Sequence, residues 1–239
     1  MLEFEALCRM KQQQTSDART LKYILVKSLG LNQFASSLTY TQPWLEQAKQ
    51  QNRHTKSKGT KIIATVGVQE YRQTIPSVVT KDDFVLEVGC HFGTSTVILH
   101  DHAQHCIGAD VGSKIIREAQ RKYPHVFFRV GNAWKTAELL RLQQEYYDSE
   151  EYRKESEANS DQDDVQSTRQ IGYDVVYVDV GGLSGSDGLL DTIALLSSLK
   201  CSLEPRHIVV KSMCLQRLAA RLHAYWKWQK QQDGDRKCP

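Results

Sequence analysis

Two glycines and a carboxylate lie close together in the segment EVGCHFGT, residues 87–94. The segment begins within a short apolar run that starts at Phe84. Gly89 would let the chain turn tightly after a strand, and Gly93 would let the next helix begin close to a ligand. Backbone N–H groups at such a helix start attract carboxylates and phosphates. The spacing is not GxGxxG, so the segment fits a dinucleotide fingerprint poorly, and a simple strand-to-helix turn is the alternative.

Asp110 is a second candidate, because it closes the run HCIGAD 23 residues after Glu87. An acid at the end of the strand that follows a glycine turn can bind both hydroxyls of a ribose. The same carboxylate could instead cap the helix that follows it. The glycine turn and the acid together are more specific than either feature alone.

The segment GNAW follows the next apolar run, VFFRV. Asn132 offers both a donor and an acceptor, which suits the edge of an adenine, and Trp134 could line that base. The alternatives are turn chemistry for Asn132 and packing in the hydrophobic core for Trp134. For Trp134, core packing is the favoured interpretation.

Two charged residues close two further apolar runs. Asp179 ends YDVVYVD, and a carboxylate at the end of a buried strand is costly unless it is paired or used. Lys211 lies at the end of RHIVVKS. A lysine with a lowered pKa can accept the proton of a hydroxyl, and a neighbouring carboxylate can orient it. Pairing of Lys211 with Asp179, or exposure to solvent, is the structural alternative.

The elements that must position these residues are five β-rich runs that alternate with helical patterns. Their apolarity is continuous rather than alternating, which is typical of strands covered on both faces in a parallel α/β sheet. Ligands bind beyond the carboxyl ends of such strands, which is where the candidate residues lie. The runs cover residues 84–89, 105–110, 126–132, 173–179 and 206–212.

From about residue 82 to 212 the chain resembles a class I S-adenosylmethionine-dependent methyltransferase, through EVGCHFG, GAD, GNAW, YDVVYVD and IVVKS in that order. The resemblance implies a Rossmann-like three-layer sandwich with strand order 3-2-1-4-5, and S-adenosylmethionine as the cofactor. It places the loop of Glu87, Gly89 and Gly93 on the methionine moiety, Asp110 on the ribose, Asn132 and Ala133 on the adenine, and Asp179 near the methyl group. The residues it assigns to the cofactor are Glu87, Gly89, His91, Gly93, Thr94, Asp110, Val111, Asn132, Ala133 and Asp179.

The chain departs from the family pattern in ways that bear on the acceptor. His91 stands where the family has a middle glycine, and no proline follows Asp179, which weakens a base N-methylation interpretation. Asp179 and Lys211, the predicted catalytic pair, resemble part of the Lys-Asp-Lys-Glu set of RNA ribose 2′-O-methyltransferases. Lys61 is too far from Glu87, and Lys81 too close to it, to supply the first lysine of that set. No further strand with a glutamate follows Lys211.

The charge is unevenly distributed, although its sum is only +3. Residues 1–81 hold 12 Lys/Arg and 5 Asp/Glu, residues 145–168 hold nine acids and two bases, and residues 200–239 hold nine bases and three acids. The predicted organisation is a helical N-terminal extension with a basic linker (1–81) and a methyltransferase-like domain (82–239) with an acidic surface insert (148–170). The basic ends predict RNA as a partner. A protein partner, or an ordinary solvated surface, is the alternative.

Several classes are excluded or disfavoured. No run approaches the about 18 apolar residues of a membrane helix, and the N-terminus lacks the pattern of a signal peptide. The six cysteines form no CxxC pair, which predicts reduced thiols in a cytosolic or nuclear protein. The residues His100, Asp101, His102, His105 and Cys106 are interpreted as an exposed polar loop and not as a metal site.

After residue 212 the chain has room for one helix from about Met213 and a polar tail, but no C-terminal antiparallel hairpin is recognisable. The sequence therefore predicts a methyltransferase that acts on RNA, at a ribose hydroxyl. The alternatives are a methyltransferase of a small molecule or a protein side chain, and a non-catalytic binding protein with the same fold.

Overall fold

A seven-stranded sheet forms the centre of the computed structural model, which describes residues 38–40, 59–149, 152, 172–183, 185 and 188–222. The order of its strands is β1-β2-β7-β6-β3-β4-β5, and each neighbouring pair is parallel. Because every strand runs in the same direction, all their carboxyl ends meet at one edge of the sheet. The strands are β1 (Leu38–Tyr40), β2 (Lys61–Thr65), β3 (Phe84–Val88), β4 (His105–Asp110), β5 (Phe127–Val130), β6 (Val175–Val178) and β7 (His207–Lys211).

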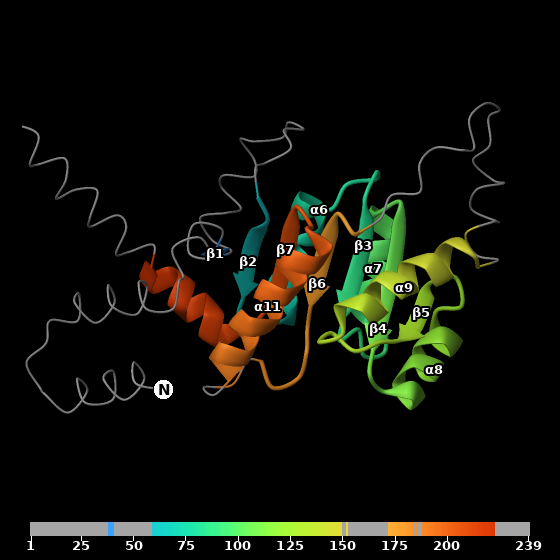
Figure 1. The fold of residues 1–239 in the computed structure, drawn as a ribbon. Coiled ribbons are helices and arrows are strands. Elements are labelled where there is room, and N and C mark those ends of the chain that lie inside the picture. Colours follow the sequence, from blue (N-terminus) through green and yellow to red (C-terminus); the bar gives the residue numbers. More distant parts are fainter. Residues whose placement is uncertain are drawn as a thin grey trace, which may run out of the picture.

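Helices cover both faces of this sheet, so the described chain has three layers (Figure 1). Successive side chains of β3 point into opposite layers. Leu86 packs with the helices α9 and α11, whereas Val85 packs with α5, α6 and α7. All five residues of β3 are buried, as expected for a strand between two helical layers. The helices are α5 (Val68–Gln73), α6 (Ile75–Val78), α7 (Thr94–His102), α8 (Ser113–Lys122), α9 (Thr136–Tyr147) and α11 (Leu189–Leu203), and residues 213–222 are also helical.

The predicted Rossmann-like architecture and the predicted strand order are confirmed. The five strands expected from the apolar runs are β3, β4, β5, β6 and β7, and their order in space is 3-2-1-4-5 in the numbering of the prediction. The helix predicted from Met213 is also confirmed over residues 213–222, where Leu215 and Leu222 are buried. α8 begins at Ser113, and its N-cap is Gly112.

Two strands that the sequence did not predict extend the sheet beyond β7. β2 lies in the segment predicted as a helical extension with a basic linker, and it pairs with β7 in the register Ile62 to Ile208 and Ile63 to Val209. Both isoleucines are fully buried, one on each face of the sheet. The edge of β7 is therefore covered by a parallel strand from the N-terminal side of the chain.

The residues interpreted as an exposed polar loop are placed differently. Residues 100–102 belong to α7 and residues 105–106 to β4, where Cys106 is 1% exposed because it packs beneath α7. Within the described ranges, no three His, Cys, Asp or Glu side chains are grouped so that they could hold a metal ion.

None of the helices described is both long enough and apolar enough for a membrane span. The predicted helices within residues 1–50, most of the acidic insert and the C-terminal tail lie outside the described residues.

Candidate functional site

A cavity of about 690 Å³ opens at the edge of the sheet where the carboxyl ends of the strands meet. Its volume is in the usual range for small-molecule sites, about 300–1,000 Å³. Ten of the eleven predicted site residues line it, and Gly93 is the exception. The ten are Glu87, Gly89, His91, Thr94, Asp110, Val111, Asn132, Ala133, Asp179 and Lys211.

The turn after β3 requires glycine at two positions, because the backbone there has a positive φ and no room for a side chain. Gly89 has φ +79°, and a Cβ atom there would lie 2.2 Å from the carbonyl oxygen of Asp179. This glycine therefore lets the end of β3 approach the end of β6. Gly93 has φ +77°, and a Cβ atom there would lie 2.4 Å from Cζ of Phe128. Its small size thus serves the packing of α7 against β5 and not the lining of the cavity.

His91 occupies the position at which the family has a glycine, and it adopts the left-handed conformation with φ +50°. That conformation costs a residue with a side chain about 1–2 kcal/mol. The His91 N–H donates a hydrogen bond of 3.2 Å to Oδ2 of Asp110, and the imidazole contacts the ring of Phe92 with 4.0 Å between centroids. The histidine side chain is exposed at the rim of the cavity.

Asp110 ends β4 and holds two loops together through its carboxylate. Oδ2 accepts the His91 N–H, and Oδ1 accepts the N–H of Gly112 at 2.9 Å. Because Gly112 is the N-cap residue of α8, the carboxylate also supports the start of that helix. A carboxylate has about four lone-pair sites. Asp110 can therefore accept ligand hydroxyl groups in addition to these two backbone donors.

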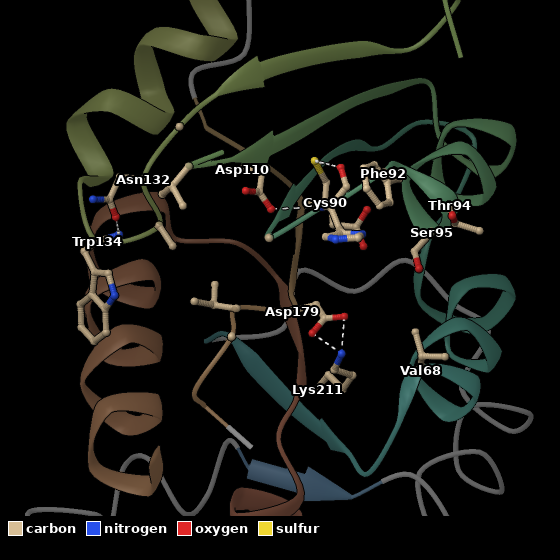
Figure 2. Close-up of a pocket in the computed structure, with 18 of the residues that line it drawn as sticks. Val68, Cys90, Phe92, Thr94, Ser95, Asp110, Asn132, Trp134, Asp179 and Lys211 are labelled. Carbon is tan, nitrogen blue, oxygen red and sulfur yellow. Dashed lines mark hydrogen bonds and ion pairs between the residues drawn. The ribbon is translucent and has the colours of Figure 1, made fainter. Parts of the chain in front are cut away.

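Asn132 and Trp134 form one side of the cavity (Figure 2). Oδ1 of Asn132 accepts the N–H of Trp134 at 3.0 Å, so the asparagine does have the role in a turn that was its alternative interpretation. The favoured interpretation of Trp134 as a core residue is wrong, because its side chain is 47% exposed. Trp134 follows β5, which ends at Val130, and it is one of the residues that line the cavity.

Glu87 is a buried acid in the wall of the cavity, with 1% of the residue exposed. Oε1 accepts a hydrogen bond of 3.1 Å from the Tyr71 hydroxyl, and Oε2 accepts one of 2.5 Å from the Thr96 hydroxyl. Burial raises the pKa of Glu87 to about 7, and the negative charge of Asp179 adds to this increase. The two hydrogen bonds and Arg72 lower the pKa, but less than burial raises it. Near neutral pH the residue can therefore exist with or without its proton.

Asp179 and Lys211 form an ion pair at the cavity, between its two sides (Figure 2). Nζ of Lys211 donates a hydrogen bond of 2.5 Å to Oδ2 of Asp179. The pairing that was the structural alternative for Lys211 is thus present, and it brings the two predicted catalytic residues together. An ammonium group held by a carboxylate in this way can orient an acceptor group and stabilise negative charge on it.

The cavity also has lining residues that the sequence did not reveal. The most informative are on α5 and α7, where Nε of Arg72 donates a hydrogen bond of 2.9 Å to Oγ of Ser95. The apolar run of β2 followed by Gly67 is a strand-turn-helix signal that could have identified α5. Burial raises the pKa of the Cys90 thiol, so this lining group is neutral. The lining residues that were not among the predicted site residues are Val68, Arg72, Cys90, Phe92, Ser95, Gly131, Trp134, Val180 and Gly181.

No protein-family model and no curated protein matches this chain. The solved structures similar to it are mostly S-adenosylmethionine-dependent methyltransferases. A TehB-like methyltransferase from Corynebacterium glutamicum is 15% identical, with 76% of this chain and 79% of that chain covered and a TM-score of 0.36. A dimethyladenosine transferase from Plasmodium falciparum is 17% identical, with 54% and 38% covered and a TM-score of 0.31.

The protein YcgJ from Bacillus subtilis is 14% identical, with 54% of this chain covered and a TM-score of 0.33. The alignments span 44% of YcgJ and 38% of the Plasmodium enzyme, which is less than half of either chain. Similarity at this level leaves the substrate of the present chain unassigned.

Proposed function

We propose that this protein is an S-adenosylmethionine-dependent methyltransferase. The observation that carries the proposal is the grouping of Glu87, Asp110, Asn132 and the Asp179–Lys211 pair around one cavity. These residues come from the ends of separate parallel strands, where α/β proteins bind nucleotides. Their order across the cavity matches the order of chemical groups along the cofactor.

The donor and acceptor groups of the cavity fit the cofactor. The Asp110 carboxylate has acceptor capacity for the two ribose hydroxyls, and the GNAW segment offers an amide and an exposed indole to a base. The carboxylates of Glu87 and Asp179 suit the ammonium and sulfonium charges. His91 is compatible with this arrangement, since its backbone adopts the left-handed conformation that glycine favours and the residue is exposed.

When bound, S-adenosylmethionine would supply a methyl group on a positively charged sulfur. The contribution of the protein is then to align an acceptor with that methyl group, which can lower the barrier by several kcal/mol, up to about 7–11. Asp179 and Lys211 would hold the acceptor. The Asp179 carboxylate would take the proton of the acceptor hydroxyl, and the Lys211 ammonium would stabilise the negative charge that develops on the acceptor oxygen.

For the acceptor, we propose a ribose hydroxyl of RNA. The ion pair of Asp179 and Lys211 supports a hydroxyl, because these groups can orient an O–H and stabilise the resulting oxyanion. The 12 Lys/Arg of residues 1–81 support a polyanionic substrate, because cationic segments bind phosphates without regard to sequence.

Calorimetric titration with S-adenosylmethionine and S-adenosylhomocysteine tests the cofactor. We expect saturable binding of both compounds by the full chain. Failure of both to bind would refute the enzymatic function and favour a non-catalytic protein with this fold.

Transfer of a labelled methyl group to separated RNA, protein and metabolite fractions tests the acceptor. We expect label in RNA, at linkages that resist alkaline hydrolysis because the 2′-oxygen is methylated. Label in alkali-sensitive RNA would refute the ribose hydroxyl, and label in the protein or metabolite fraction alone would refute RNA.

Substitution of Lys211 tests its role. Lys211→Ala should lower kcat by at least about 100-fold, the lower range for loss of a group that stabilises a developing oxyanion, and leave the affinity for S-adenosylmethionine unchanged. Lys135→Ala is the matched control, since Lys135 is a mainly exposed residue outside the cavity lining. Full activity of the Lys211 variant would exclude the proposed role.

A further inference from the structure

The side of the cavity opposite Asn132 and Trp134 is formed by α5 and by the first turn of α7. Figure 2 shows Thr94 and Ser95 on α7 and Val68 on α5 across the cavity from the GNAW segment. α5 precedes the strands that carry the family resemblance. One wall of the candidate site is therefore built from a segment that the resemblance does not cover.

Arg72 is the cation of this wall, and two contacts fix its position. Nε donates to the hydroxyl of Ser95, a residue that is 7% exposed at the start of α7. The preceding residue, Tyr71, is fully buried and donates a hydrogen bond to Glu87 from its hydroxyl. α5 is thus attached to β3 through one residue and to α7 through the next. The guanidinium is consequently held at the cavity.

The cavity has two permanent cations among its described lining residues, Arg72 and Lys211. Lys211 forms the ion pair with Asp179. Arg72 uses Nε for Ser95, and no hydrogen bond joins its two Nη nitrogens to any residue in the described ranges. Those two nitrogens carry four N–H donors in one plane, which matches the two oxygens of a carboxylate.

We infer that Arg72 binds the carboxylate of the methionine moiety of S-adenosylmethionine. The inference rests on the proposed function. That cofactor has a single anionic group, at the end of the molecule opposite the adenine. With the adenine at Asn132, the carboxylate would reach the α5 and α7 side, where Arg72 is the cation.

The charges around Arg72 agree with this assignment. Glu87 and Asp179 lie close enough to each other to interact, and Arg72 is close enough to lower the pKa of Glu87. The methionine moiety carries an ammonium group on the same carbon as the carboxylate. The wall offers an anion and a cation side by side for this pair of opposite charges.

Decarboxylated S-adenosylmethionine provides the test, because it lacks the carboxylate but keeps the ammonium, the sulfonium and the adenosine. Both ligands are titrated calorimetrically into the wild type and into Arg72→Gln. The wild type should prefer S-adenosylmethionine. The substitution should weaken its binding by about 10- to 100-fold, while binding of the decarboxylated ligand stays within about twofold or becomes tighter.

Two further variants separate recognition from structure. Arg72→Lys should retain part of the preference, since an ammonium keeps the charge but not the planar pair of donors. Arg121→Gln is the matched control, because the Arg121 side chain is 79% exposed on α8 and outside the cavity lining. Thermal unfolding of each variant reports whether the fold is retained.

The inference is overturned if Arg72→Gln weakens both ligands equally, which would show that the arginine only holds α5 in place. It is also overturned if the preference for S-adenosylmethionine persists in the variant. If the wild type binds neither ligand, the proposed function itself fails, and the inference fails with it.

Discussion

At the scale of single residues, Glu87 couples the candidate site to pH. Its carboxyl group lies in the cavity wall between the hydroxyls of Tyr71 and Thr96, and burial raises its pKa to about 7. Below that pH the group is neutral, and above it the group carries a negative charge that a cationic ligand would favour. A ligand with ammonium and sulfonium groups should therefore bind the ionised form and release a proton when it meets the neutral form.

We predict that the affinity for S-adenosylmethionine rises by up to about tenfold between pH 6 and pH 8, as the ionised fraction of Glu87 increases. Glu87→Gln should bind more weakly at pH 8 and show a flat profile. Calorimetry in two buffers of different ionisation enthalpy would measure the proton release directly.

His91 is the other described lining residue with a side chain that could change its charge near neutral pH, so His91→Asn is the control. This variant should keep the pH dependence of binding. A flat profile for His91→Asn together with a retained pH dependence for Glu87→Gln would refute the role of Glu87. The effect of Glu87 on folding stability changes with pH in the opposite direction to its effect on ligand affinity. Because its pKa is raised in the folded state, Glu87 stabilises the fold at low pH, and this contribution is lost as pH rises through about 7.

At the scale of elements, the turn between β3 and α7 depends on the approach of two strand ends. We predict that Gly89→Ala lowers the free energy of unfolding by more than about 2 kcal/mol, because the methyl group would meet the backbone of Asp179 and the φ angle is positive. Urea unfolding measures the change. Gly181→Ala is the control and should change stability by less than about 0.5 kcal/mol, since nothing lies within 4 Å of the added carbon and the φ angle is not positive. Equal stability of the two variants would contradict the packing argument.

The elements that the sequence predicts well are those with long apolar runs and a local signal at their ends. Five strands, and the polar residues that end them at the cavity, follow from apolar runs such as FVLEV. The order of these strands and the full set of cofactor residues were implied by the resemblance to class I methyltransferases. The apolar run of β2 is a local signal of a strand that the prediction omitted, whereas the pairing of β2 with β7, which lies 146 residues further along the chain, has no local signal. Arg72 belongs to no recognisable sequence motif, and its position at the cavity depends on the contact of α5 with α7. Trp134 was assigned to the core because large aromatic side chains are usually buried there.

At the scale of the whole molecule, the segment before residue 82 is part of the sheet and of the cavity. β2 contributes buried side chains to both faces, and α5 contributes Tyr71 and Arg72 to the site. Arg206, just before β7, also contacts this part of the chain, because it donates a hydrogen bond of 2.9 Å to the carbonyl of Val78. The same guanidinium forms an ion pair with the buried Asp83, which lies just after the segment. The two ends of the described chain are thus joined in one structure.

A chain that begins at residue 82 should therefore fail to fold cooperatively. It would expose the edge of β7 and lose fully buried residues such as Ile62, Ile63 and Tyr71. Circular dichroism during heating and size-exclusion chromatography measure the outcome. A chain that begins at residue 36 keeps β1 and β2 and is the control. Cooperative unfolding of the shorter chain, with retained ligand binding, would show that residues 82–239 are an independent domain.

The position of β2 also has a consequence for synthesis of the protein on the ribosome. β2 is translated before the central strands β3, β4, β5 and β6, yet its neighbour towards the centre of the sheet is β7, the last of the seven strands to be made. Pairing of Ile62 and Ile63 with Ile208 and Val209 has to wait until residue 211 has left the exit tunnel. During that interval the nascent chain carries an apolar strand without its central partner, which is the kind of segment that chaperones bind.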